Sequence, residues 1–310
     1  MSNRRQFIQS FSAIMLSPLI IKSSMITSQK VFKASLNPGA IGIICTAHEL
    51  LEYAIKYKFR AISPLLGDLI KLDEIEKEAY LNKMKKNKIV FDSAGLPIEF
   101  RTSEAKFQKG YEFLRQNVKA IISLNISSFV TWIMPTHKTL TYIQNFKQHQ
   151  ARLSKVASLL ENEGLKLGLE YVGPKTLMSR DKYPFLHSIA GLRELIEAIG
   201  KKNIGYLLDS FHTYCAEDSN KDLEFLKAED IISVQLNDGV LGRTISTQKD
   251  LERELPGDTE IIDLKNFLNF INSKGYQGPV SVEPFNKELN KMELDEKLKR
   301  VRASFLKFGI

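Results

Sequence analysis

The chain has 310 residues, of which 43% are hydrophobic and 26% charged, and a formal net charge of +8. These fractions indicate a soluble globular protein with a filled core and exclude a largely disordered chain. Four of the 44 basic side chains lie in the first 30 residues, which contain no acid, so the remaining 40 face 36 acidic ones. This near balance gives no indication of nucleic-acid binding. Cys45 and Cys215 follow no zinc or redox spacing and are interpreted as free thiols.

The first residues resemble a twin-arginine export signal. Arg4 and Arg5 are followed by Phe7 and Ile8 and then by the apolar stretch FSAIMLSPLII. The resemblance predicts a leader over residues 1–35 and an exported, periplasmic protein. Because no Ala-x-Ala cleavage site follows, a cytoplasmic protein with an N-terminal extension is the alternative. The apolar stretch is too short for a confident membrane span, so no stable membrane association is expected.

Beyond residue 38, short apolar runs alternate with amphipathic helical patterns. Eight runs are predicted as strands: Ile41–Cys45, Ala61–Leu66, Ile89–Ala94, Ser128–Met134, Leu167–Val172, Ile204–Phe211, Ile231–Leu236 and Pro279–Pro284. Six patterns are predicted as helices: Ala47–Tyr57, Glu74–Lys86, Ser103–Gln116, Tyr142–Glu163, Gly191–Ile199 and Leu264–Ser273. Gly164, Gly200 and Gly275 follow three of these helices, where a left-handed cap favours glycine.

This alternation predicts parallel strands joined by helical crossovers. Eight strand–helix units over about 270 residues match a (β/α)8 TIM barrel, which typically needs about 250. A doubly wound sheet is the alternative, but the glycine-rich phosphate turn expected after its first strand does not occur in IGIICTAHE. We therefore predict a single α/β barrel over residues 36–310.

Polar residues end four consecutive predicted strands. They are Glu170, Asp209, Gln235 and Glu283, in LGLEYVG, YLLDSFH, SVQLND and VSVEPF. In a barrel, the carboxyl ends of the strands face one pocket, so these side chains should converge there. Three carboxylates and an amide oxygen are hard donors that suit one divalent ion, with Mn²⁺ first and Mg²⁺, Co²⁺ or Zn²⁺ as alternatives.

Residues 38–308 resemble the xylose-isomerase-like superfamily, which includes sugar phosphate isomerases and epimerases. The resemblance is carried by TWIMPTH, LGLEYVGP, LLDSFH, VQLNDG, LPGDTEII and VSVEPF, in this order at the strand ends. It implies that the four strand-end residues bind the metal, although many relatives have histidine where this chain has Gln235. It also implies a proton transfer through a metal-stabilised enediolate, with Glu170 and Glu283 as the two catalytic bases.

Further residues are expected to contact a substrate. The resemblance places His212, Asp238 and Arg253 in that role, and the loops after the fourth and fifth predicted strands add His137 and His187. Asp238 could instead serve a turn, and Arg243 competes with Arg253 for an anion-binding role. Trp132 is expected in the barrel core, with a wall for sugar stacking as the alternative.

The resemblance favours a metal-dependent isomerase or epimerase of a sugar, polyol or related hydroxy-carbonyl compound. A lyase that dehydrates an inosose-like keto-polyol on the same site is the alternative, and a binding barrel without activity is a further one. An abasic-site endonuclease is disfavoured, because that family binds several zinc ions through additional histidines, and of the five histidines present only His212 stands in a matching place. The expected partner is a small unphosphorylated sugar or polyol, not nucleic acid. A homo-oligomer is compatible with the sequence, which does not decide it.

Overall fold

The computed structural model describes residues 32–310. The twin-arginine-like motif therefore lies outside the described residues, and so does nearly all of the leader predicted over residues 1–35. Strand β1 spans Lys33–Leu36, so the barrel begins slightly before the predicted boundary at residue 36. None of the helices in residues 32–310 combines the length and the apolar character needed to cross a membrane.

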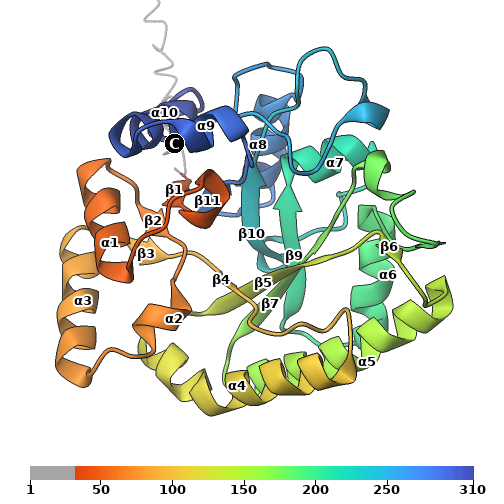
Figure 1. Cartoon of the computed structure of the whole chain (residues 1–310), viewed down its shortest axis with the longest axis horizontal. Coiled ribbons are helices and arrows are strands. Elements are labelled where there is room, and N and C mark those ends of the chain that lie inside the picture. The colour runs from red at the N-terminus through yellow and green to blue at the C-terminus, as the bar shows by residue number, and fades with distance from the viewer. Residues whose placement is uncertain (1–31) are drawn as a thin grey trace, which may run out of the picture. The chain divides into compact units, whose positions relative to one another are not determined.

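Nine parallel strands form one sheet in the described part of the chain (Figure 1). They are β1, β2 (Ala61–Ile62), β3 (Val90–Phe91), β4 (Ala94–Gly95), β5 (Ser128–Ile133), β7 (Lys166–Tyr171), β9 (Ile204–Asp209), β10 (Ile231–Leu236) and β11 (Pro279–Val282). Their order is β3-β2-β1-β11-β10-β9-β7-β5-β4. Two short strands, β6 (Thr136–His137) and β8 (Tyr183–Pro184), form a separate antiparallel pair.

The sheet closes into a barrel at β3 and β4, the two strands at the ends of this order. Strand β3 pairs with β2, and β4 pairs with β5. Only Asp92 and Ser93 separate β3 from β4 along the chain, so the two short strands share one barrel position between them. This gives the eight strand positions of a (β/α)8 barrel and confirms the predicted fold class.

Helices cover the outside of the barrel. They are α1 (Ala47–Lys56), α2 (Leu66–Leu69), α3 (Glu74–Lys86), α4 (Glu104–Ser123), α5 (Tyr142–Glu161), α6 (Ile189–Ile199), α7 (Ser210–Ala216), α8 (Leu264–Ser273), α9 (Lys287–Lys291) and α10 (Leu294–Leu306). All six predicted helices are present, and α4 continues beyond its predicted end. Residues such as Val156, Leu160, Leu167 and Leu169 form the fully buried layer between helices and sheet.

The first predicted strand is wrong. Residues Gly39–Ile41 form a short 3-10 helix that ends at Gly42, whose φ is +66°. A left-handed residue cannot be part of an extended strand, and glycine adopts this conformation without strain. Ile41 and Ile43 are nevertheless buried, which explains why the segment reads as an apolar strand. The actual first strand, KASL, is shorter and less apolar.

Candidate metal-binding and catalytic site

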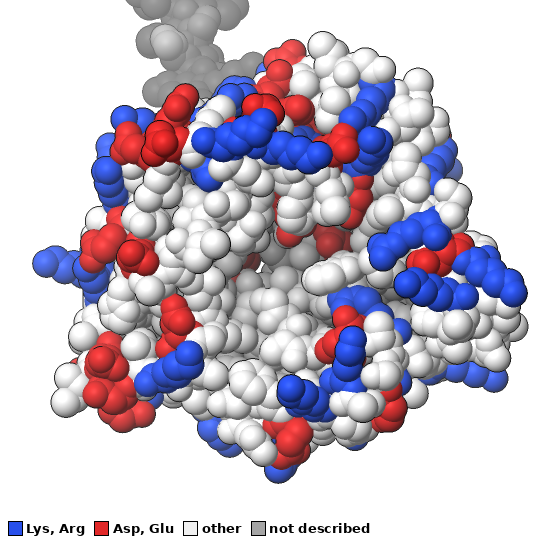
Figure 2. All heavy atoms as spheres, in the orientation of Figure 1, with Lys and Arg blue, Asp and Glu red and all other residues white. Residues whose placement is uncertain are grey.

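A cavity of about 1280 Å³ opens at the carboxyl ends of the barrel strands. Figure 2 shows the hollow near the centre of this face, with acidic atoms visible inside it. Glu170, Gln235 and Glu283 are among its lining residues. This is the end of the barrel where the loops after the strands build ligand sites.

The structure brings the four predicted ligands together. Glu170, Asp209 and Gln235 lie on β7, β9 and β10, and Glu283 directly follows β11; the four strands are consecutive neighbours in the sheet. Asp209 and Gln235 pair directly across β9 and β10. The side-chain amide of Gln235 is 3.1 Å from Asp209 Oδ2 and 3.1 Å from Glu283 Oε2, distances at which its nitrogen can donate to both. One ligand atom each of Glu170, Asp209 and His212 lies within 4.8 Å of the others.

Asp209 and His212 are held together by the start of α7. Helix α7 begins directly after β9, and Asp209 caps it by accepting a hydrogen bond from Phe211 N at 2.6 Å. His212 therefore lies one helical turn beyond Asp209 on the side of the cavity. Gly173 lets the chain after β7 approach this turn, because a Cβ there would be 2.3 Å from the His212 carbonyl oxygen.

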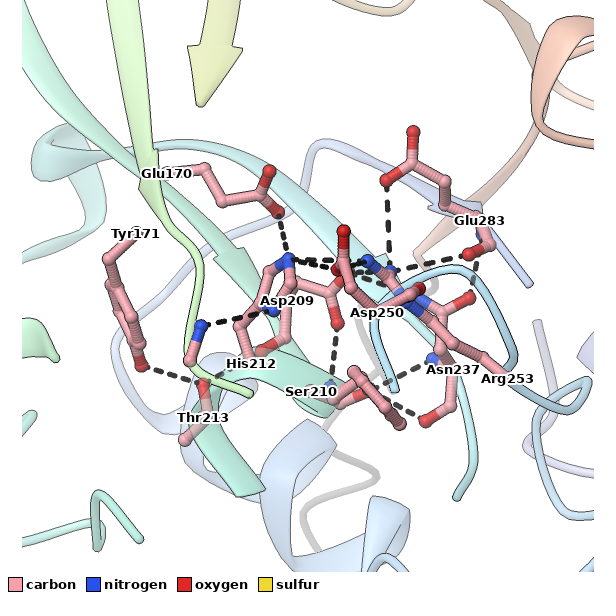
Figure 3. A network of polar contacts seen from close by, with 12 residues as sticks. Glu170, Tyr171, Asp209, Ser210, His212, Thr213, Asn237, Asp250, Arg253 and Glu283 are labelled. Atoms are coloured by element: carbon pink, nitrogen blue, oxygen red, sulfur yellow. Dashed lines mark hydrogen bonds and ion pairs between the residues drawn. The ribbon is translucent and has the colours of Figure 1, made fainter. Parts of the chain in front are cut away.

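Both ring nitrogens of His212 face hydrogen-bond donors. Its Nδ1 accepts a hydrogen bond from Gly173 N at 3.3 Å. Its Nε2 lies 3.3 Å from Arg253 Nη2, and a guanidinium can only donate, so neither nitrogen is marked as the protonated one. Burial first, and then the charge of Arg253, lower the pKa of His212 well below its usual value, so the ring is neutral. Its Nε2 is 3.8 Å from Glu170 Oε1 (Figure 3). His212 therefore faces the acidic centre, where it forms with Glu170 and Asp209 a buried group of side chains that could hold a metal ion.

Arg253 is a buried cation that pairs with acidic residues of the protein, whereas the sequence predicted that it would bind a substrate anion. It is 2% exposed. Its guanidinium donates to Asp209 Oδ2 at 2.9 Å, to Asp250 Oδ1 at 2.6 Å and to the Glu283 carbonyl oxygen at 3.3 Å. Figure 3 shows it between Asp209 and Glu283. Its donors are already used by the protein, so they are not free for a substrate anion.

Two residues of this network were missed in the sequence. Asn237, fully buried, donates from Nδ2 to Asp209 Oδ2 at 2.9 Å and accepts from Glu283 N at 2.7 Å. Asp250, from the loop after β10, holds Arg253 and lies 3.7 Å from His212 Nε2. Asn237 could have been noticed as the polar residue that directly follows β10. Asp250 lies in a long polar loop and gives no such signal.

Burial raises the pKa of the three strand-end carboxyl groups. For Glu170 the largest cause is desolvation, followed by the charges of Asp209 and Glu283. Desolvation also dominates for Asp209, but the Arg253 charge partly offsets it. The pKa of Glu283 rises to about 7, again mainly because of burial. Asp209, Asp250 and Glu283 therefore form ion pairs with one guanidinium, and the charge of Glu170 also acts on it.

This donor set fits a divalent cation. Glu170 Oε1 is buried and has no hydrogen-bond partner among residues 32–310. The side-chain amide of Gln235 lies between two carboxylate oxygens, and its nitrogen can donate to both at 3.1 Å. Rotation of the amide would instead present its oxygen to a bound ion. The 2+ charge of such an ion would also reduce the excess of buried negative charge.

The other predicted substrate contacts separate into two groups. His137 lines the cavity, and its Nδ1 accepts from the amides of Thr139 and Leu140. Asp238 and His187 are not among the lining residues. The Asp238 carboxylate accepts four backbone amides, those of Gly239, Thr259, Glu260 and Ile262, at 2.8–3.2 Å. It therefore organises a loop, which corrects its predicted contact with substrate.

Trp132 does not lie in the barrel core, where it was expected. It is 49% exposed and lines the cavity. The Arg101 guanidinium lies 4.1 Å from its ring centroid, and Arg101 Nη2 donates to Thr131 Oγ1 at 2.6 Å. Trp132 thus offers a fixed apolar wall, which is the alternative that the sequence left open.

The fold and the site define a class of protein, a (β/α)8 barrel with a buried acidic centre at the carboxyl ends of its strands. Within that class, the chain belongs to the xylose isomerase-like TIM barrel family, whose model matches residues 51–306. It is 27% identical over 150 residues to the inosose isomerase of Halalkalibacterium halodurans. That match covers 48% of this chain and 50% of the relative, so it spans about half of the relative's length.

Solved structures agree on the fold. A xylose isomerase domain protein from Alicyclobacillus acidocaldarius has a TM-score of 0.77 at 28% identity, over 89% of this chain and 98% of that chain. A structure of the IOLI protein with a bound zinc atom has a TM-score of 0.73 at 19% identity, over 89% of this chain and 97% of that chain. At 19% identity, the second likeness concerns the fold alone.

Proposed function

We propose that this protein is a divalent-metal-dependent isomerase or epimerase of a sugar or keto-polyol. The observation that carries the proposal is the position of Glu170 on β7 and of Glu283 directly after β11, the two outer strands of the four that contribute to the acidic centre. Two carboxyl groups that face one cavity from different sides can remove a proton from a carbon and return it elsewhere. The inosose isomerase name of a relative supports the same class.

Each side chain has a separate task in the proposed reaction. One glutamate takes the proton from the carbon beside a carbonyl group, and the C–H electron pair forms a carbon–carbon double bond while the carbonyl oxygen gains negative charge. The other glutamate returns a proton to the opposite face or to the neighbouring carbon. His212, whose Nε2 lies 3.8 Å from Glu170 Oε1, is assigned to stabilising the charged oxygen.

The proposed metal ligands are Glu170, Asp209, Gln235 and Glu283. A divalent ion bound there would act as a Lewis acid toward the oxygen that becomes negative. Asn237 and Arg253 hold Asp209 and Glu283 in place through the bonds described above. The all-oxygen set supports Mn²⁺ or Mg²⁺ before Zn²⁺ or Co²⁺, and the zinc of the IOLI structure keeps zinc among the candidates.

Two measurements test this function. Elemental analysis of the purified protein should find one divalent ion per chain, which Glu283→Gln should largely lose. The metal-loaded protein should then exchange a carbon-bound hydrogen for solvent deuterium in an inosose, ketose, aldose or hydroxypyruvate panel. Loss of water from the product would identify the lyase instead. A protein that takes up no ion and exchanges no hydrogen would leave only a binding barrel.

Export remains a prediction for residues 1–35. A fusion of this segment to a reporter that must fold before translocation should reach the periplasm, and Arg4→Lys together with Arg5→Lys should stop it. Equal export after both changes would refute a twin-arginine route, and a wild-type fusion that stays in the cytoplasm would support the cytoplasmic alternative.

A further inference from the structure

A second polar cluster lies inside the barrel, beneath the acidic centre. Asp92 and Ser93 form the break between β3 and β4, and Asp92 is 8% exposed. Ser233 of β10 and Ser281 of β11 are each 3% exposed. Asp92, Ser93, Ser233 and Ser281 all line the same cavity as the acidic centre. None of them has a part in the proton transfer described above.

Strand geometry fixes the depth of this cluster. Ser233 precedes Gln235 by two residues on β10, and Ser281 precedes Glu283 by two residues at β11. Side chains two residues apart on a strand point to the same face, at a spacing of about 6.6 Å. The serines therefore lie one layer below the acidic centre. Asp92 belongs to that lower layer, because its Oδ1 accepts from Ser233 Oγ at 3.4 Å.

Asp92 lacks the partners that a structural carboxylate normally has. It accepts the amide of its own neighbour, Ser93, at 2.7 Å, and the long bond from Ser233. No lysine, arginine or histidine of residues 32–310 forms a salt bridge with it. Burial, the largest cause, raises its pKa, and the hydroxyl of Ser35 is a further polar neighbour that partly offsets this.

Asp238 is a buried carboxylate of the opposite kind. It is fully buried and receives four backbone amides, so its charge is satisfied by the fold. A buried carboxyl group with fewer partners costs free energy unless something else bonds to it. Asp92 faces the cavity, so a ligand can supply that bond.

We propose that Asp92, together with Ser233 and Ser281, forms a hydroxyl-binding subsite at the base of the cavity. It recognises a hydroxyl group of a polyol, at a distance of one strand layer from the carbons that react. The inference rests on the proposed function only in placing the reacting carbons at the acidic centre. It assigns the substrate class more narrowly, as a compound with a hydroxyl far enough from its carbonyl to reach the lower layer.

The test uses a polyol that cannot react. Binding of myo-inositol and of its monodeoxy analogues to the metal-loaded protein is measured by titration calorimetry. Asp92→Ala should weaken myo-inositol binding by about 10- to 100-fold, the usual effect of losing a hydrogen bond to a charged group. The monodeoxy analogue that lacks the recognised hydroxyl should bind the wild-type protein more weakly than myo-inositol does, by a similar factor. Asp92→Ala should bind this analogue and myo-inositol with equal affinity.

Matched variants guard against a folding artefact. Asp263→Ala removes an exposed carboxylate that caps α8 and does not line the cavity, so it should bind myo-inositol as the wild type does. If Asp92→Ala does not fold, Ser233→Ala and Ser281→Ala replace it. Each removes one neutral hydroxyl and should weaken binding by about 2- to 10-fold.

The outcomes separate the subsite from the proposed function. Unchanged affinity in the Asp92 and serine variants, no polyol binding by the wild type, or equal binding of every deoxy analogue would overturn the subsite. If the protein turned over a carbonyl substrate and Asp92→Ala left the KM unchanged, the subsite would also be overturned. The proposed function would not be affected. Polyol binding that depends on Asp92, without hydrogen exchange in any carbonyl compound, would support the subsite and refute the proposed function.

Discussion

Glu283 should make the metal-free protein less stable as the pH rises. Burial raises its pKa from 4.5 to about 7. A carboxyl group whose pKa is higher in the folded state stabilises the fold below its unfolded pKa, and this contribution is lost as the pH rises through the folded value. The window for Glu283 therefore runs from about 4.5 to about 7.

The magnitude follows from the two values. The difference between 4.5 and about 7 corresponds to at most roughly 3 kcal/mol of unfolding free energy. Glu283→Gln keeps the size of the side chain and removes its charge. At pH 8, and with the metal chelated, this variant should be more stable than the wild type by up to that amount, while the two converge near pH 4.5. It should nevertheless bind metal poorly and lose turnover.

Urea unfolding in the presence of EDTA, at steps from pH 4.5 to 8.5, measures the effect. Glu78→Gln, which neutralises an exposed glutamate on α3, is the matched control and should follow the wild type within about 0.5 kcal/mol. Parallel curves for the wild type and Glu283→Gln would refute the reasoning, since they would mean that Glu283 does not ionise at a cost in the folded protein. Adding a divalent ion should reverse the order, because only the wild type gains binding energy.

Three other substitutions test separate parts of the site. Glu170→Gln should slow hydrogen exchange by at least about 100-fold and leave the far-UV dichroism unchanged, as expected for a lost proton-transfer group; near-normal exchange would exclude Glu170 as a base. Gln235→His should shift metal preference toward Zn²⁺ or Co²⁺ in competition dialysis, and unchanged selectivity would mean that Gln235 is not a ligand. Gly173→Ala should lower the unfolding free energy by about 1–3 kcal/mol, because its Cβ would be 2.3 Å from the His212 carbonyl oxygen. Gly67→Ala, which meets no atom within 4 Å, should change it by less than about 0.5 kcal/mol in the same urea titration.

The sequence predicts the acidic centre well because strand ends are a topological property. Glu170, Asp209, Gln235 and Glu283 each follow a buried apolar run, and parallel strands bring such ends to one edge without any knowledge of side-chain direction. The four positions could therefore be identified from pattern alone. Their proximity in the structure depends on register, which the alternation of inward and outward residues fixes.

Side-chain direction is where the sequence was insufficient. Asn237 and Asp238 are adjacent, yet Asn237 bonds Asp209 while Asp238 points to the loop at 254–262. Successive residues after a strand point to opposite sides, and nothing in NDG says which one faces the site. Arg253 was predicted to await a substrate anion, but acids from three separate segments surround it.

Arg253 also explains how such an acidic centre can exist in a folded chain. Without a cation, several buried carboxyl groups would repel one another and each would lose its hydration. The guanidinium is planar, always charged and able to donate in several directions, so it can hold Asp209 and Asp250 at once. Among residues 32–310, Oε1 of Glu170 has no hydrogen-bond partner, and Glu170 forms no ion pair with Arg253. The acidic centre is thus held together by a cation of the protein itself, and the carboxyl charge that Arg253 does not balance would favour a divalent ion at the proposed site.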